Sequence, residues 1–261
     1  MKTCMIALGC LVALAAPAVG EVVFCDGFDG TGYDHDAWED VATLQSQLQW
    51  DCSPGSTVTT SVADGLATFS GDGGSAWDYG RALVSDAAFA APTGTDYYVY
   101  TADLAVLNGT LGVGHQFIAG IGILDGGEPN GWSVEGSVLH AYAYADVDGF
   151  IAEVNYRDET GRHMGNGGAP PANGPGVLTM IVAPDAITFS CDGAAVYRYA
   201  PLPSGSYDTF RIAIYGAARV GGDSVHASFD SVSLALVPEP ATVALMLVGC
   251  AAGFAGRAKR S

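Results

Sequence analysis

Two groups of aromatic residues beside glycine-rich loops are suited to binding sugars. Trp77, Tyr79 and Arg81 follow a loop of Gly and Asp, and Trp132 follows a Pro-Asn-Gly turn. An aromatic ring can lie against the apolar face of a pyranose while polar neighbours bond its hydroxyl groups, and binding residues concentrate on loops. The alternative is burial in the core, the usual place for large aromatics at strand starts. We take these four residues as candidate carbohydrate-binding residues.

Motifs for hydrolysis are missing from the sequence. There is no Gly-x-Ser-x-Gly elbow, and the five histidines form no His-Glu-x-x-His zinc pair. A glycoside hydrolase needs two carboxylates about 5 to 9 Å apart across the scissile bond. Glu153 stands five residues after Asp148 and two before Asn155, so this stretch does not place two acids on one strand face. We therefore expect no catalytic residue, with a glycan-degrading enzyme that uses an unfamiliar acid pair as the alternative.

The C-terminal end of the chain has three parts. Val237-Pro238-Glu239-Pro240 comes first, followed by an apolar run over residues 241–255 and a basic end that begins at Arg257. Because proline cannot continue a strand ladder, the preceding strand must end at about Leu236. The apolar run is short for a membrane span, but basic residues behind it hold a C-terminus on the cytoplasmic side. We expect residues 241–255 to enter the membrane and the preceding chain to lie outside.

This tail resembles the PEP-CTERM sorting signal of bacteria that export proteins to the cell envelope. The resemblance covers residues 237–261 and implies that an exosortase, a membrane protease of transpeptidase type, recognises Val237, Pro238, Glu239 and Pro240. It also implies that the C-terminal helix is removed and that the protein is transferred to the surface or the extracellular matrix. The alternative is an ordinary C-terminal anchor or a buried helix.

The N-terminus has the pattern of a secretory signal peptide. Lys2 supplies a positive charge, an apolar segment extends from Cys4 to Ala16, and Ala18-Val19-Gly20 is a small-x-small cleavage site. These signals predict a signal peptide over residues 1–20, one β-sandwich domain over 21–237, and a sorting and membrane segment over 238–261. The middle part is long enough for a single well-buried core.

The predicted domain is strongly acidic. Residues 21–237 contain 27 Asp and Glu residues, six Arg residues and no Lys, a formal net charge of −21. Nucleic acids are bound by basic residues that neutralise phosphates, so such a surface excludes DNA and RNA as partners. The acidic excess suits solubility, divalent cations or a neutral polysaccharide.

Three cysteines remain between the two terminal signals. An exported protein can form disulfides, and a bond between Cys25 and Cys52 would stabilise the fold by about 3 kcal/mol if the geometry allows it. Alternatively, Cys25, Cys52 and Cys191 are all small buried side chains.

Short segments with period-two alternation predict an antiparallel all-β sandwich or barrel. The expected strands are 57–62, 66–70, 97–107, 117–124, 138–145, 150–157, 177–183, 187–191, 194–199, 210–215 and 225–236. Apolar residues from Trp38 to Leu48, at spacings of three, three and four, predict a short helix over 36–49. A segment rich in Gly, Asn and Pro predicts a long mobile loop over 157–176.

Two terminal segments and a central hairpin resemble concanavalin A-like and jelly-roll carbohydrate-binding domains. The segments are Phe24 to Gly30 followed by Trp38, and His226 to Leu234, and the hairpin turns at Asp192-Gly193. The resemblance implies a jelly-roll fold in which the first and last strands pair. It also implies a structural calcium ion near these strands, for which Asp29 and Asp230 are the matching carboxylates. The alternative is that both carboxylates cap turns and face water.

The laminarinase-like members of this fold carry Glu-x-Asp-x-x-Glu on one strand, a spacing that this sequence lacks. Together the patterns predict an exported protein of the cell envelope or matrix that binds polysaccharide without cleaving it. A glycoside hydrolase or lyase on the same fold is one alternative. A structural surface-layer component without a small ligand is another.

Overall fold

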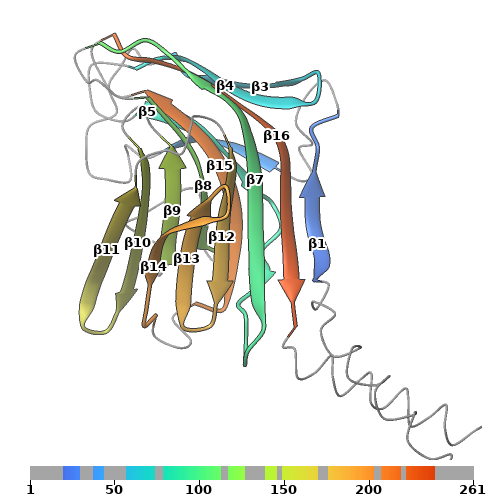
Figure 1. Ribbon diagram of the computed structural model, residues 1–261, viewed down its shortest axis with the longest axis vertical. Helices are drawn as coiled ribbons and strands as arrows, with labels where there is room; N and C mark the ends of the chain where they lie inside the picture. Colours follow the sequence, from blue (N-terminus) through green and yellow to red (C-terminus); the bar gives the residue numbers. More distant parts are fainter. Residues whose placement is uncertain are drawn as a thin grey trace, which may run out of the picture.

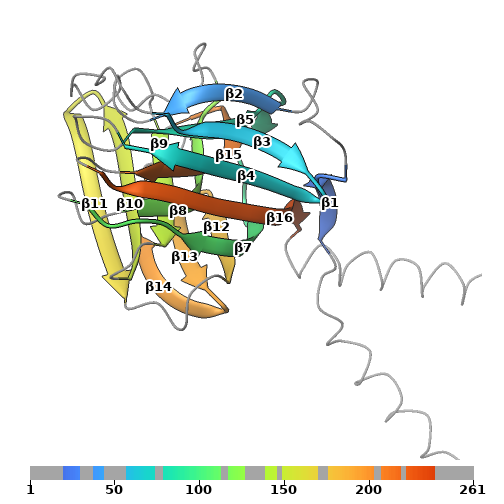
Figure 2. The same cartoon turned by 90° about the horizontal axis from the view of Figure 1, so that it is seen from above.

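The chain folds into two antiparallel β-sheets that pack face to face, as the computed structural model shows (Figure 1; Figure 2). The structure describes residues 20–29, 38–43, 57–73, 79–112, 117–126, 139–145, 149–169, 176–202, 207–218 and 222–238. All described strand pairs are antiparallel, which confirms the predicted all-β antiparallel sandwich.

The first sheet contains both the first and the last strand. Its members are β1 (Glu21–Asp26), β3 (Thr59–Ala63), β4 (Leu66–Asp72), β7 (Tyr97–Asn108), β12 (Val177–Ala183), β13 (Ala186–Cys191), β14 (Ala194–Tyr199) and β16 (Ser224–Val237). They lie in the order β14, β13, β12, β7, β16, β4, β3, and β1 also pairs with β16. The first and last strands are therefore neighbours, as the resemblance implied.

The second sheet covers the other side of the core. Its members are β2 (Trp38–Thr43), β5 (Tyr79–Ser85), β6 (Phe89–Ala90), β8 (Phe117–Asp125), β9 (Leu139–Ala145), β10 (Phe150–Asp158), β11 (Gly161–Ala169) and β15 (Thr209–Ala218). They lie in the order β11, β10, β9, β8, β15, β5, β2, with β6 beside β15.

The strands predicted from period-two alternation are confirmed. Two of the hairpin turns that connect them have the backbone geometry that an Asp-Gly sequence favours. The turns Asp64-Gly65 and Asp192-Gly193 have φ values of 54° and 77° and of 50° and 76°. Positive φ at both central residues is the requirement of the favoured two-residue hairpin turn, and Asp-Gly meets it at low cost. The sequence of these turns therefore sets the register of β3 with β4 and of β13 with β14.

Side chains from both sheets form one core between them. Phe69, Phe150, Phe189 and Phe210 are among the fully buried side chains. Tyr100 in β7 donates its hydroxyl hydrogen to the carbonyl oxygen of Ala213 in β15 at 2.7 Å, so a buried hydrogen bond joins the two sheets. Burial raises the pKa of Tyr100 well above its ordinary value, which keeps the hydroxyl a donor.

Strand β1 is joined to the second sheet through Asp26 and Trp38. The indole Nε1 of Trp38, a residue only 1% exposed, donates to Asp26 Oδ2 at 2.7 Å. The other carboxylate oxygen of Asp26 accepts from the backbone N–H of Phe28 at 2.7 Å. Phe24 meets the Trp38 ring edge-on, with 5.1 Å between centroids. The contacts of Phe24, Asp26 and Phe28 with Trp38 therefore close one side of the sandwich.

On the opposite side of the sandwich, tyrosine rings of β14 pack directly against glycines of β11. A Cβ atom added at Gly165 or Gly167 in β11 would overlap the rings of Tyr197 and Tyr199 in β14. The predicted mobile loop over 157–176 is wrong for residues 161–169, which form β11 paired with β10. Gly-rich composition is typical of loops, but here glycine permits close packing between edge strands.

The predicted helix over 36–49 is also wrong. Residues 38–43 form β2, which pairs with β5 over six residues. The helical spacing of a few apolar residues is a weak preference, and backbone pairing at the sheet edge overrides it. The remaining residues of that segment lie outside the described part of the chain.

β16 ends at Val237, one residue beyond the predicted end, and Pro238 follows it. Glu239, Pro240 and the predicted membrane segment lie outside the described residues, as do residues 1–19. In the part of the chain that the structure describes, no helix is long and apolar enough to cross a bilayer.

We expect Asp26→Ala to lower the free energy of unfolding by about 1–3 kcal/mol, because the buried Trp38 N–H loses its acceptor. Asp26→Asn keeps an oxygen acceptor and should lose less. Asp86→Ala, at an exposed loop residue, serves as the control. Chemical denaturation measures all three, and an unchanged midpoint for Asp26→Ala would show that the Trp38 contact contributes nothing.

Candidate functional site

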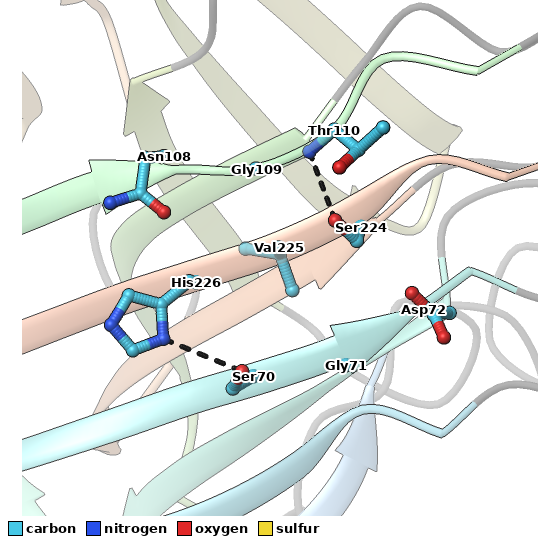
Figure 3. A pocket seen from close by; sticks show the side chains of 9 residues that line it. All are labelled: Ser70, Gly71, Asp72, Asn108, Gly109, Thr110, Ser224, Val225 and His226. Carbon is cyan, nitrogen blue, oxygen red and sulfur yellow. Dashed lines mark hydrogen bonds between the residues drawn. The ribbon is translucent and has the colours of Figure 1, made fainter.

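A polar hollow lies on the outer face of the first sheet, where β4, β16 and β7 run side by side (Figure 3). Its volume is about 520 Å³, and it is open to solvent. The lining residues are Ser70, Gly71, Asp72, Asn108, Gly109, Thr110, Ser224, Val225 and His226. Six of the nine have polar side chains, so the hollow is suited to a polar ligand.

The floor of the hollow is one register row of the sheet. His226 in β16 is paired with Ser70 in β4 on one side and with Asn108 in β7 on the other. The Nδ1 atom of His226 lies 3.4 Å from the Ser70 hydroxyl, a long hydrogen bond (Figure 3). Alternation places all three side chains on the face opposite the core residues Phe69 and Ala227.

Hydrogen bonds hold the walls of the hollow. The Thr110 N–H donates to the Ser224 hydroxyl at 2.9 Å, and the Ser224 N–H donates to the Thr110 carbonyl at 2.9 Å. Asp223 is fully buried, its carboxylate accepts from the Gly112 N–H, and its carbonyl accepts from the Gly73 N–H. Asp223 therefore connects the chain beyond β7 with the chain beyond β4.

The predicted carbohydrate-binding residues are not part of this hollow. Trp77 and Trp132 lie outside the described residues. Tyr79 is the first residue of β5, and its side chain is likewise outside the description. Arg81 is half-buried and aligned with Gly216, on the core-facing side of β5 that also carries Leu83.

The carboxylates near the paired terminal strands include a group around Asp103 that was not predicted from the sequence. Asp230 and Asp192 are close enough to Asp103 in β7 to act on it. Partial burial first, and then Asp230 and Asp192, raise the pKa of Asp103. Asp29 follows β1 and is exposed. Among the described residues, no three His, Cys, Asp or Glu side chains could together hold a metal ion. Calcium at Asp29 and Asp230 stays a prediction.

The two described cysteines have different environments. Cys25 is exposed and Cys191 is buried, and among the described residues neither forms a disulfide. Burial raises the pKa of Cys191, with a smaller contribution from Asp192. Cys52 lies outside the described residues, so its bond with Cys25 stays a prediction.

The second sheet keeps its strand-borne glutamates apart. Glu39 in β2 and Glu153 in β10 fall in one register row, separated by β5, β15, β8 and β9. Five steps of about 4.8 Å place their Cα atoms roughly 24 Å apart, far beyond the separation of a glycosidase acid pair.

The immediate neighbours of Glu153 are also not acids. In its register row it is flanked by Tyr142 and Asn166, and along β10 by Ile151 and Asn155. In the described strands of this sheet, Glu153 therefore has no adjacent carboxylate on its own face.

Sequence reasoning missed the hollow and the carboxylate group around Asp103. Ser70 and His226 are 156 residues apart in the chain, and Asn108 lies between them. No local motif links residues at such separations, because sheet pairing alone brings them together.

The tail matches the model of the PEP-CTERM protein-sorting motif over residues 236–260. The chain therefore carries this sorting motif at its C-terminus, which implies an exported protein sorted to the surface. No curated protein matches the sequence.

The sandwich is similar to solved structures of glucan-acting enzymes. LamA from Zobellia galactanivorans, solved with laminaritriose and laminaritetraose, is 16% identical with a TM-score of 0.57, over 82% of this chain and 98% of that one. The endo-1,3-beta-glucanase from Streptomyces sioyaensis is 14% identical with a TM-score of 0.58, over 86% and 99%.

A glycoside hydrolase family 16 endo-glucanase from Bacteroides ovatus is 10% identical with a TM-score of 0.56, over 81% and 99%. Identities this low show a shared fold and nothing more. The predicted concanavalin A-like jelly roll is confirmed, and it is the fold of these glucanases.

The raised pKa of Asp103 predicts a pH dependence of stability. The ordinary pKa of an Asp carboxyl group is 3.8, and the pKa of Asp103 is higher than this in the folded protein. Such a group lowers the free energy of unfolding as the pH rises from 3.8 through the raised pKa, because the unfolded protein loses its proton more readily. We expect Asp103→Asn to be more stable than the wild type at neutral pH, by about 0.5 kcal/mol after solvent screening. Below about pH 4 the two should converge.

Thermal unfolding between pH 3 and pH 8 measures this difference, and high salt should reduce it. Asp86→Asn, which removes an exposed loop carboxylate, is the matched control. Parallel stability curves for Asp103→Asn and the wild type would contradict the repulsion among the three aspartates.

Proposed function

We propose that this protein is exported through the sorting signal and binds neutral polysaccharide at the cell surface or in the extracellular matrix, without cleaving it. An exosortase-type protease would recognise Val237, Pro238, Glu239 and Pro240 and remove the membrane segment. Binding would be weak at each site and gain strength from many copies on one polymer.

The observation that supports this function best is a glucanase fold in which the glutamates of the described strands of the second sheet form no adjacent pair. The fold is shared with LamA, whose structure includes laminaritriose and laminaritetraose. On the second sheet, Glu39 and Glu153 are five strand steps apart, and neither can assist the other across a glycosidic bond. A glycan-binding surface without catalysis is consistent with both facts.

Charge selects the class of polysaccharide. Residues 21–237 carry a formal net charge of −21, which repels anionic polymers. A neutral glycan is not repelled by this charge. We propose that Trp77, Tyr79 and Trp132 contact the glycan with their aromatic rings against its sugar faces. Arg81, which lies half-buried on the core-facing side of β5, is left out of this surface.

A structural calcium at Asp29 and Asp230 is a further part of this proposal, although the described residues show no complete ligand set. Calcium requires six to eight oxygen ligands. A rise in the melting temperature with calcium, lost in Asp230→Asn, would support it, and identical melting with calcium and with a chelator would oppose it.

We expect the purified full-length protein to bind laminarin or another neutral glucan and to release no reducing sugar. Trp77→Ala together with Trp132→Ala should weaken binding about tenfold or more, because each lost stacking contact costs about 1 kcal/mol. Met164→Ala, at an exposed apolar residue of β11, is the control and should bind like the wild type.

Calorimetry measures binding, and a reducing-sugar assay measures cleavage. Release of oligosaccharides would favour the glycoside hydrolase instead. If no neutral or charged polysaccharide binds, and the protein assembles into two-dimensional layers, a structural surface-layer component would be favoured.

A further inference from the structure

We propose that the polar hollow on the first sheet is a second saccharide-binding site, independent of the loop aromatics. The inference rests on the proposed function, because it takes the same ligand class. The volume of about 520 Å³ falls in the range of small-molecule sites, roughly 300–1,000 Å³.

The lining residues disfavour anionic and apolar ligands. None of the nine is Lys or Arg, and Asp72 adds a carboxylate, so the hollow does not favour phosphates or acidic sugars. Val225 is the one large apolar residue in the lining, so a lipid or aromatic ligand would gain little. Hydroxyl, amide and imidazole groups both donate and accept hydrogen bonds, which matches the hydroxyl groups of a neutral sugar.

The floor offers polar atoms at the spacing of the strands. Ser70, His226 and Asn108 occupy three adjacent strands, so the row spans about 10 Å from β4 to β7. This length accommodates a sugar ring lying across the strands. His226 and Asn108 are exposed side chains, and the one bond recorded for the imidazole is the long contact with Ser70. Nε2 of His226 and the Asn108 amide are therefore available to a ligand.

The hollow is held open by the fold itself. At Gly109 a Cβ atom would overlap the carbonyl oxygen of Ser224, and at Gly71, with φ of 151°, it would overlap the carbonyl oxygen of Thr57. Because glycine has no Cβ atom, the neighbouring backbone segments can approach each other closely at these two positions. Together with the bonds between Thr110 and Ser224, this fixes the walls before any ligand binds, which reduces the ordering cost of binding.

The hollow lies at the end of β16 that is remote from the sorting motif. Ser224 and Val237 are the two ends of this strand, roughly 40 Å apart along it. A protein tethered through its C-terminus would carry the hollow away from the membrane, where matrix polymers are accessible.

The test uses laminaritetraose as the probe and the purified full-length protein. We expect laminaritetraose to shift the imidazole resonances of His226 in NMR spectra. Asn108→Ala combined with His226→Ala should weaken binding at this site about tenfold, the value of about two lost hydrogen bonds. Thr179→Ala, on the same outer face but on β12, is the control and should bind like the wild type.

The outcomes separate this inference from the proposed function. If laminarin binds and the loop variants weaken it, but His226 does not respond and the hollow variant binds normally, the second site is overturned and the proposed function stands. A response of His226 to divalent cations but not to the oligosaccharide also overturns the second site. If no neutral polysaccharide binds the wild type, both proposals fail. Thermal unfolding of each variant confirms that it is folded.

Discussion

Backbone pairing by strand β16 is the interaction on which the rest of the structure depends. Along one edge it pairs with β7 over nearly its whole length, and along the other it pairs first with β4 and then with β1. Its inward residues, Ala227, Phe229, Val232 and Leu234, are all buried in the core. One strand therefore joins the start, middle and end of the chain, and both ends of the domain depend on its register.

Strand β16 also places the polar hollow and the sorting motif at its opposite ends. Its first residues, Ser224 to His226, form part of the polar hollow, and its last residue, Val237, begins the Val-Pro-Glu-Pro element of the sorting motif. At that second end, a Cβ atom at Gly20 would lie only 2.9 Å from Val237 Cγ2. The residue before the predicted signal-peptide cleavage site thus packs against Val237, the first residue of the Val-Pro-Glu-Pro motif. Both predicted processing sites lie at one end of the first sheet, and the hollow lies at the other.

The sequence predicts most of the sandwich because each strand has one buried and one exposed face. Where that alternation is clear, as in β7 and β12, the predicted and observed bounds agree. Prediction from alternation fails at the edge strands of the second sheet. β11 is rich in glycine because the rings of Tyr197 and Tyr199 need its bare backbone, and composition alone reads such a segment as a loop. The hollow could not be predicted, since Ser70, Asn108 and His226 become neighbours only through pairing between distant strands.

The two faces of the sandwich differ in what they could do with a glycan. Hydrolysis requires two carboxylates held a few ångströms apart, and the second sheet separates its glutamates by several strands. Recognition requires only polar groups in a fixed array, and the first sheet holds hydroxyl, amide and imidazole groups in adjacent strands. In the described strands of the second sheet, the two glutamates are therefore too far apart to act together, whereas the first sheet holds adjacent groups that can bond hydroxyls. Burial shields the hydrogen bond between Tyr100 and Ala213 from water, so this bond between the two sheets is electrostatically stronger than an exposed one.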